Sequence, residues 1–352
     1  MQKVNVLGKY DIAIGERLIE RAGMAIKRVC KGDRCCVVSD DNVAPLYAEK
    51  VLDSLKSVGI EPSLFVFKHG EESKNLDTVT QMLDFFAEQG LTRGDFAVAL
   101  GGGVVGDLTG FAAAIYLRGI QFVQIPTTLL AQIDSSVGGK TGCDIKRGKN
   151  LVGAFHHPAL VLVDTGALDT LPEEYMKDGM GELIKYGAIK SSEIFEILEK
   201  ETCFNRLNEL IYKCICIKAE IVEKDFTEQG DRALLNFGHT IGHAIEKLEN
   251  FCGLSHGCAV AIGMCIITRA AERVELCHEG NAKRIEDVCK KYDLPTQYDA
   301  SAKDLADAAM NDKKRLGSFI KLVLIRKIGD SYLCPVNCDE LDRFIEGSIK
   351  SV

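Results

Sequence analysis

The sequence predicts an N-terminal α/β domain with a parallel sheet and an all-α C-terminal domain. Up to about residue 170, short β-branched and apolar runs alternate with segments of helical periodicity, which is typical of parallel sheets. Beyond that point almost every segment has helical periodicity. A chain of 352 residues is long enough for about two domains. We therefore expect domains at 1–170 and 171–352, with Pro172 at the start of the first helix of the second domain.

The individual elements follow from these patterns. In the first domain we expect strands at 35–40, 64–67, 96–103, 122–128 and 160–164, and helices at 43–59 and 76–90. In the second domain we expect helices at 172–189, 191–201, 206–226 and 256–276. Residues 321–329 are the one segment of the second domain that has the pattern of a strand.

Charge and cysteine usage limit the function classes. The net charge of −8 argues against nucleic-acid binding, which needs a basic face for phosphates, although local clusters of Lys and Arg could still bind an anionic substrate. The 14 cysteines lie mostly within apolar runs, and the first residues are mixed and charged rather than an apolar signal segment. No uncharged apolar run is long enough to span a membrane. We expect reduced cysteines and a cytoplasmic protein without a membrane segment.

A glycine-rich loop follows the strand expected at 96–103. Gly101, Gly103 and Gly106 have the GxGxxG spacing, which lets backbone N–H groups at a helix N-terminus approach a pyrophosphate. Unlike the usual fingerprint, the loop is not at the first strand, and the next strand ends in Pro-Thr-Thr without an acid for a ribose. Asp40, at the end of an earlier strand, could take that role or be a solvated turn acid. The motif thus indicates a Rossmann-like dinucleotide-binding domain. The alternative is that the glycines only form a tight strand-to-helix turn.

Histidines and one acid suggest a metal site in the second domain. His239 and His243 are four residues apart and share a helix face, and His256 opens an apolar helix. The HExxH metalloprotease motif is incomplete, because its glutamate is missing. Glu182 and Lys185 lie on an otherwise apolar helix, where charges are costly without partners. Glu182 with two histidines would form a three-ligand site with an open position, as in catalytic zinc centres. The alternative is core histidines and a Glu182–Lys185 ion pair.

Residues 126–158 are expected to form a long functional loop, because they are rich in Gly, Ser, Thr and Lys and lack hydrophobic periodicity. Lys140, Lys149 and Asn150 are donors suited to a phosphate, and Asp134 could act as an acid or contact a cofactor. Further positive groups come from Arg118, Lys218, Arg232 and Lys313. Any single lysine is more often a solvated surface group, so the prediction depends on their gathering in glycine-bounded segments.

The chain resembles the 3-dehydroquinate synthase family over about residues 36–330. The motifs that carry the resemblance occur in family order: GGGVVGDLTGF, YLRG, PTTLLAQIDSSVGGKTG, GKNLVGAFHHP, TLPEE, GELIKYG, LLNFGHTIGHAIE and SHGCAVAIGM. The resemblance implies an NAD-binding α/β domain and a helical metal- and substrate-binding domain in a homodimer. It also implies that Glu182, His239 and His256 bind one divalent metal ion, zinc or cobalt.

The resemblance also assigns roles by matching position. It implies that NAD contacts Asp40, Glu71, Lys74, Gly102, Gly103, Val104, Asp107, Thr127, Thr128, Leu130, Asp134, Ser135, Lys149 and Thr170. Substrate groups would meet Lys140, Asn150, Lys185, Lys218, Arg232, Asn236, His243 and either Lys313 or Lys314, while Arg118 would reach the phosphate site of the neighbouring subunit. Two positions depart from the family pattern: Tyr175 replaces a common acid, and GELIKYG replaces the commoner AEVIKYG.

The implied reaction is the second step of the shikimate pathway, in which 3-deoxy-D-arabino-heptulosonate 7-phosphate becomes 3-dehydroquinate and phosphate. NAD would transiently oxidise a secondary alcohol, phosphate would leave, the hydride would return, and an intramolecular aldol reaction would close the ring. The metal would act as a Lewis acid. The substrate is thus a small phosphorylated sugar acid.

Three other functions deserve comparison. A cyclase of the 2-deoxy-scyllo-inosose synthase type needs no arginine for a carboxylate, so Arg232 argues against it. Asn236 before Phe-Gly-His also fits the dehydroquinate pattern better. A metal-dependent polyol dehydrogenase of the glycerol dehydrogenase type would not need the phosphate loop at 140–150. A non-catalytic dinucleotide-binding sensor would need neither the metal trio nor the anion cluster.

Overall fold

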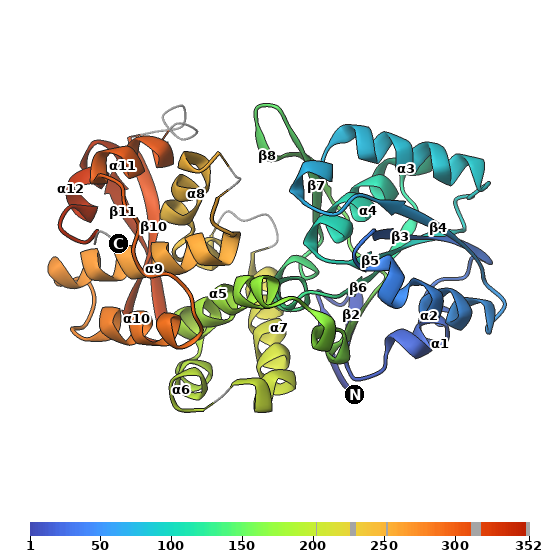
Figure 1. Cartoon of the computed structure of the whole chain (residues 1–352), viewed down its shortest axis with the longest axis horizontal. Coiled ribbons are helices and arrows are strands. Elements are labelled where there is room, and N and C mark those ends of the chain that lie inside the picture. Colours follow the sequence, from blue (N-terminus) through green and yellow to red (C-terminus); the bar gives the residue numbers. More distant parts are fainter. Residues whose placement is uncertain (202, 226–229, 251–252, 311–317, 350–352) are drawn as a thin grey trace. The chain divides into compact units, whose positions relative to one another are not determined.

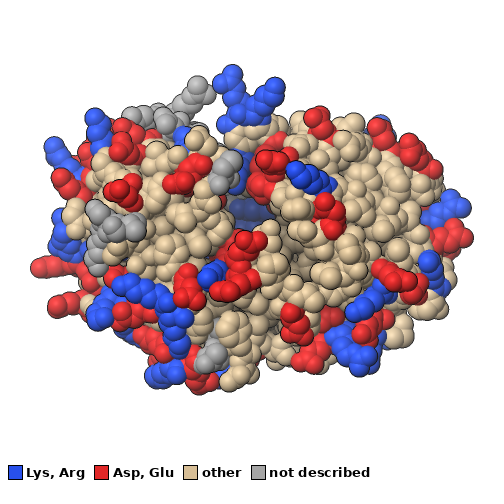
Figure 2. Space-filling model, in the orientation of Figure 1, with Lys and Arg blue, Asp and Glu red and all other residues tan. Residues whose placement is uncertain are grey.

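A computed structural model describes residues 1–201, 203–225, 230–250, 253–310 and 318–349 (Figure 1). The chain divides into two compact units. The first comprises Met1–Pro172 and Lys218–Glu223, and the second comprises Glu173–Ile217 and Lys224–Val352. Acidic and basic side chains are interspersed over the face that Figure 2 shows.

The first unit is built on a seven-stranded sheet in the order β1-β2-β9-β6-β5-β3-β4. The strands are β1 (Gln2–Val6), β2 (Tyr10–Gly15), β3 (Arg34–Asp40), β4 (Glu61–Phe67), β5 (Phe96–Gly101), β6 (Gln121–Pro126) and β9 (Leu160–Asp164). All neighbours are parallel except β1 and β2, which form an antiparallel edge hairpin. The five predicted strands are confirmed, and the edge hairpin was not predicted.

Helices cover both faces of this sheet, because its central strands are apolar on both sides. Helices α1 (Ala22–Ile26) and α2 (Ala44–Lys56) pack on one face, and α3 (Leu76–Glu88) and α4 (Gly103–Ile115) on the other (Figure 1). Successive residues of β3 show the alternation: Val37 belongs to the core under α1 and α2, and Val38 to the core under α3 and α4. The α/β prediction for this part of the chain is therefore confirmed.

The segment 126–158 is not the long loop that the sequence suggested. It contains a π-helical turn at Ala131–Ser135 and an antiparallel hairpin of β7 (Lys140–Ile145) and β8 (Gly148–Phe155). Glycines have low strand propensity and therefore hid the hairpin. The structure uses them for close pairing, since a Cβ on Gly153 would lie 2.2 Å from the carbonyl oxygen of Thr141.

The second unit is mainly helical, as predicted, with one addition. Its helices are α5 (Glu173–Lys190), α6 (Ser192–Lys200), most of α7 (Leu207–Lys224), α8 (His239–Leu248), α9 (His256–Arg273), α10 (Asn281–Lys291), α11 (Ala302–Met310) and α12 (Leu341–Ile345). The addition is a hairpin of β10 (Phe319–Lys327) and β11 (Asp330–Asn337). The strand expected at 321–329 is β10, while its partner strand was not predicted.

Helix α9 is the centre of the second unit. It is buried along nearly its whole length and contacts α5, α8 and α10. Arg269 in its last turns ties three other segments to it. The guanidinium donates to Glu286 Oε1 at 2.7 Å, to the carbonyl oxygen of Thr296 at 2.6 Å and to that of Ser348. Arg269 therefore anchors the last turns of α9 to α10 and to the segments around Thr296 and Ser348.

The cysteines and the helices bear on two earlier expectations. None of the cysteines whose side chains the structure describes forms a disulfide. Within the described residues, no helix combines the length and the apolar character needed to cross a membrane.

Candidate functional site

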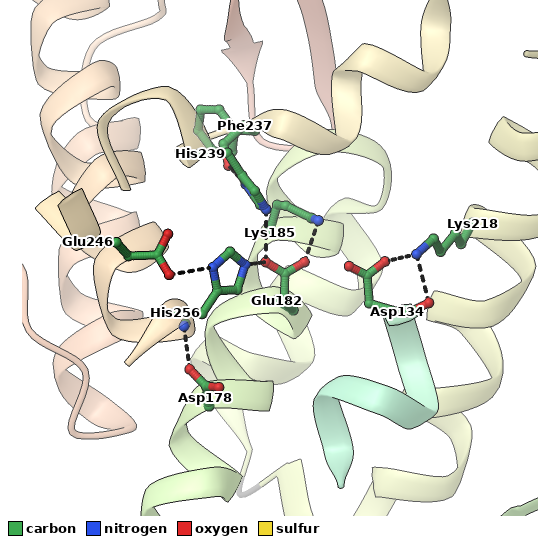
Figure 3. A network of polar contacts seen from close by, with 10 residues as sticks. Asp134, Asp178, Glu182, Lys185, Lys218, Phe237, His239, Glu246 and His256 are labelled. Carbon is green, nitrogen blue, oxygen red and sulfur yellow. Dashed lines mark hydrogen bonds and ion pairs between the residues drawn. The ribbon is translucent and has the colours of Figure 1, made fainter. Parts of the chain in front are cut away.

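Three helices of the second unit each bring one potential metal ligand to a common point. Glu182 lies on α5, His239 is the first residue of α8, and His256 is the first residue of α9. One ligand atom from each lies within 4.8 Å of the other two (Figure 3). This is the three-ligand arrangement of catalytic zinc sites, which leave the fourth position open.

Two glycines allow α5 and α9 to approach closely enough for this arrangement. A Cβ on Gly181 would lie 2.5 Å from the carbonyl oxygen of Gly257, and a Cβ on Gly257 would lie 2.1 Å from that of Asp178. The two backbones are thus in direct contact. The Asp178 carboxylate also accepts a hydrogen bond from the backbone N–H of Gly257. The contact sets Glu182, the next residue after Gly181, beside His256.

The Glu182 carboxylate is fully buried, and its two oxygens have different surroundings. Oε2 accepts a hydrogen bond from the buried Lys185 ammonium. Oε1 has no hydrogen-bond partner among the described residues, and it lies 3.4 Å from His239 Nε2 and 3.7 Å from His256 Nε2. Burial alone would raise the pKa of Glu182, but Lys185 and His239 outweigh burial and hold this pKa well below its usual range. The carboxylate is therefore ionised.

Both histidines have their second ring nitrogen bound to an acceptor. His239 Nδ1 lies 3.1 Å from the carbonyl oxygen of Phe237, and His256 Nδ1 lies 3.3 Å from Glu246 Oε1. Since these oxygens can only accept, each Nδ1 carries a proton, and Nε2 faces Glu182. Burial lowers the pKa of His239 to about 3, so its Nε2 has a free lone pair at neutral pH. Burial also disfavours charge on His256, but the carboxylates of Glu182 and Glu246 outweigh it and raise the pKa to about 10.

A cation fits between these groups. His239 Nε2 and Glu182 Oε1 are both electron-pair donors, and only a proton or a metal ion between them turns their contact into an attraction. His243, one turn further along α8, is exposed, and its ring centroid lies 5.4 Å from that of His239 and 5.9 Å from that of His256. His243, Glu246 and His256 form a second group of potential ligands, which shares His256 with the first.

Two residues of this site were missed in the sequence. Asp178 and Glu246 contact the start of α9 through Gly257 and His256 respectively. Helical spacing could have revealed both. Asp178 is four residues before Glu182, and Glu246 is seven residues after His239, so each shares a helix face with a potential ligand.

In the first unit, the glycine loop joins β5 to the N-terminus of α4, as expected for a dinucleotide-binding loop. Gly102 is the N-cap residue and Gly103 opens the helix. A Cβ on Gly102 would lie 3.1 Å from the Thr128 side chain, and one on Gly103 would lie 3.2 Å from Ser135 Oγ. The backbone N–H of Thr127 donates to the carbonyl oxygen of Gly101. Val104 is the second residue of α4, and Leu130 directly precedes the π-helical turn. Both residues are half-buried.

Two ion pairs join four further residues that were predicted to contact the cofactor. Lys74 is buried, and its ammonium lies 2.7 Å from Asp107 Oδ2. Lys149 lies 3.6 Å from Glu71 Oε1. Burial raises the pKa of Asp107 despite the opposing effect of Lys74. The pairs place both signs of charge on the face that carries α3, α4 and the β7–β8 hairpin.

Asp40 and Thr170 have contacts of their own. Asp40 ends β3, and its Oδ1 accepts from the backbone N–H groups of Asn42 and Val43, each at 2.9 Å. Burial raises the pKa of Asp40, and these two hydrogen bonds oppose the shift. Thr170 Oγ1 lies 2.5 Å from the Tyr47 hydroxyl. Among the described residues, no hydrogen bond or ion pair joins either of them to the glycine loop.

Asp134 and Lys218 come together although 84 residues separate them. Asp134 lies in the π-helical turn, and Lys218 belongs to the part of α7 that is grouped with the first unit. The Lys218 ammonium donates to the Asp134 carboxylate and, at 2.7 Å, to its carbonyl oxygen (Figure 3). A residue predicted for the cofactor thus contacts one predicted for the substrate.

Three predicted phosphate-binding residues are exposed. Lys140 begins β7, and Asn150 lies on β8 with a positive φ of 54° and donates its backbone N–H to Asp144 Oδ1 at 2.7 Å. Arg118 follows α4 and also has a positive φ, 68°. Such backbone conformations are uncommon for residues other than glycine and often mark functional positions.

The remaining substrate residues lie in the second unit. Arg232 is buried in the 3-10 helix Asp231–Asn236, and its backbone N–H donates to Asp225 Oδ2 at 3.0 Å. Asn236, at the end of that helix, is half-buried. Lys313 and Lys314 lie outside the described residues.

Comparison with known proteins identifies the family. Residues 64–178 match the model of the 3-dehydroquinate synthase N-terminal domain, and residues 179–315 match that of the C-terminal domain. The chain is 44% identical to 3-dehydroquinate synthase of Clostridium beijerinckii over 335 residues, which covers 94% of this chain and 96% of the relative. The chain belongs to the 3-dehydroquinate synthase family. As a 3-dehydroquinate synthase of the shikimate pathway, it is a phosphate-eliminating lyase.

A second relative supports the same assignment. The 3-dehydroquinate synthase of Clostridium perfringens is 47% identical over 329 residues, which covers 92% of this chain and 94% of the relative. Both identities are well above the 26% and 28% identities to two solved cyclases of other kinds.

The solved structures confirm the fold of this 3-dehydroquinate synthase. A 2-deoxy-scyllo-inosose synthase, complexed with carbaglucose-6-phosphate, NAD⁺ and Co²⁺, matches with a TM-score of 0.86 at 26% identity and covers 98% of this chain and 99% of that chain. A 2-epi-5-epi-valiolone synthase from Streptomyces hygroscopicus, with NAD⁺ and Zn²⁺ bound, matches with a TM-score of 0.86 at 28% identity, over 99% and 98% of the chains. A probable glycerol dehydrogenase from Sinorhizobium meliloti, at 15% identity, shares the fold alone.

Proposed function

We propose that this chain converts 3-deoxy-D-arabino-heptulosonate 7-phosphate to 3-dehydroquinate and phosphate with one NAD and one divalent metal ion, zinc or cobalt. The observation that carries the proposal is the buried Glu182 Oε1, which has no hydrogen-bond partner among the described residues and faces the Nε2 atoms of His239 and His256. Three such ligands are the donor set that zinc and cobalt accept. Two related cyclases hold NAD⁺ with Co²⁺ or Zn²⁺.

NAD and the metal ion would supply chemistry that amino-acid side chains lack. When bound, NAD would supply a hydride acceptor and the metal a Lewis acid for the alcohol and carbonyl oxygens of the substrate. The protein's own residues orient these groups. Lys185 holds one oxygen of Glu182 and thereby leaves the other for the ion.

Residues of the first unit have the chemistry to hold a dinucleotide. The first backbone N–H groups of α4 belong to the Gly102–Gly103 turn and the residues directly after it. Such groups at a helix N-terminus suit a pyrophosphate. Asp40 at the end of β3 suits ribose hydroxyls. The other NAD contacts implied by the family resemblance are part of the proposal: Glu71, Lys74, Val104, Asp107, Thr127, Thr128, Leu130, Asp134, Ser135, Lys149 and Thr170.

The charged groups of the substrate account for the remaining residues. The Arg232 guanidinium suits the substrate carboxylate, because it can donate two parallel hydrogen bonds. Lys140 and Asn150 suit the phosphate, and Lys218, Asn236 and His243 suit the remaining oxygens. With the phosphate held in place, the leaving group can itself accept the neighbouring proton, and the enzyme mainly positions it. The homodimer, with Arg118 reaching the neighbouring phosphate site, and the cytoplasmic location remain predictions.

The fate of the hydride tests the proposal. The chain, loaded with zinc or cobalt, is incubated with the heptulosonate phosphate and a substoichiometric amount of NAD, and phosphate release and NADH absorbance are followed together. We expect many phosphates per NAD and no net NADH, because each hydride returns to the substrate. Removal of the metal with a chelator should stop phosphate release, and added zinc or cobalt should restore it. NADH that accumulates without phosphate release would contradict the cyclase reaction and indicate a dehydrogenase.

A further inference from the structure

Glu246 makes a contact that the proposed reaction does not require of it. It lies on α8, where its side chain is 8% exposed, and its Oε1 is 3.3 Å from Nδ1 of His256 on α9 (Figure 3). A buried carboxylate is costly unless a donor compensates it. The contact therefore links α8 and α9, the two helices that carry the histidine ligands.

The contact determines which nitrogen of the His256 ring points to Glu182. A carboxylate only accepts, so Nδ1 carries a proton, and Nε2, which lies 3.7 Å from Glu182 Oε1, is the ring nitrogen available to a metal ion. The His256 side chain is 32% exposed, against 11% for His239, so packing restrains this ring less. For His239, the carbonyl oxygen of Phe237 has the corresponding place at Nδ1.

We propose that Glu246 is a positioning residue, which fixes the ring orientation and tautomer of His256 so that Nε2 is presented to the metal. This inference rests on the proposed metal site of Glu182, His239 and His256. Hydrogen-bonded carboxylates beside ligating histidines both orient the ring and increase its basicity. In this arrangement Glu246 does not touch the ion.

A direct role for Glu246 is the competing explanation. Glu246, His243 and His256 also have ligand atoms within 4.8 Å of one another. An ion held there would use Glu246 as a ligand. The two explanations differ in what a glutamine at position 246 does, because an amide oxygen still accepts a hydrogen bond from Nδ1 but is a poor metal ligand.

Cobalt titration of the full-length, metal-free protein separates these explanations. Co²⁺ is added to the wild type, Glu246→Ala and Glu246→Gln, and both the dissociation constant and the visible absorption band are recorded. Glu249→Gln is the matched control: Glu249 is the C-cap residue of the same helix, and it accepts from the Tyr298 hydroxyl at 2.7 Å instead of from a histidine. Circular dichroism of the metal-free forms checks folding, and Glu246→Leu, which also lacks an acceptor, takes the place of the alanine variant if that variant does not fold.

We expect Glu246→Ala to weaken cobalt binding by about 10- to 100-fold with an unchanged absorption band, and Glu246→Gln to lose less. Glu249→Gln should bind as the wild type does. Unchanged affinity in folded Glu246→Ala, or in folded Glu246→Leu if the alanine variant is lost, would overturn the positioning role alone. An altered band in Glu246→Gln would overturn it in favour of a ligand role. If the wild type bound no cobalt, the proposed metal site and this inference would both fail.

Discussion

The buried pair of Glu182 and Lys185 leads to a quantitative expectation for the stability of the metal-free protein. Their side chains are 0% and 1% exposed, and Lys185 is a main reason why the pKa of Glu182 is lowered. Glu182→Gln leaves a buried ammonium without this carboxylate, and Lys185→Met leaves the carboxylate without this ammonium. Breaking a buried pair from one side costs about 3–5 kcal/mol. The double variant removes both charges, so it should cost clearly less than the sum of the two single variants.

Urea unfolding of the four proteins in the presence of a chelator measures this cycle. The exposed pair of Glu196 and Lys200 on α6 is the matched control, and Glu196→Gln and Lys200→Met should leave the free energy of unfolding almost unchanged. Zinc adds a second readout. At about 1,000 times its dissociation constant it should stabilise the wild type by about 4 kcal/mol and leave the Glu182→Gln proteins unchanged. Strictly additive costs in the double variant would refute the reasoning.

Two further expectations concern other parts of the chain. The affinity of the wild type for NAD should fall as the pH is lowered toward the raised pKa of Asp40, because the protonated carboxyl loses acceptor strength for the ribose hydroxyls. Calorimetric titration with NAD checks this, and Asp40→Asn should bind more weakly without that pH dependence; an equal pH dependence in both would exclude Asp40 as the cause. Arg269→Met should lower the free energy of unfolding by about 3–5 kcal/mol, because it removes a buried ion pair with Glu286 and two hydrogen bonds to carbonyl oxygens. Urea unfolding measures this, and a loss below about 1 kcal/mol would contradict it.

The sequence predicted the buried strands and long helices well. A strand buried on both faces is apolar throughout, and a helix buried on one face is apolar at helical spacing, so both have a clear pattern. The strands of the hairpins were harder, although their partners are adjacent in the chain. Strand β11 contains Pro335, which is unusual within a strand, and the glycines of β7 and β8 conceal their hairpin. In both cases, local composition does not record which segment supplies the hydrogen bonds.

The candidate site was predictable in its members and not in its geometry. Spacing placed His239 and His243 on one helix face, but it could not show that His239 turns inward to Glu182 while His243 remains exposed. That difference depends on how α8 packs against α5 and α9. The contact of Lys218 with Asp134 likewise depends on tertiary structure, since neither residue has a local pattern that points to the other.

The glycine contact between α5 and α9 bears on how this protein can evolve. Where helices meet through side chains, each substitution in the interface changes their separation, and the ligands they carry move with them. At Gly181 and Gly257 the separation is set by main-chain atoms, which are the same in every sequence. The surrounding helical core can therefore exchange one apolar residue for another over many generations while the spacing between Glu182 and His256 is preserved. The same main-chain contact thus explains why the core tolerates substitutions and why Gly181 and Gly257, which are small and chemically inert, do not.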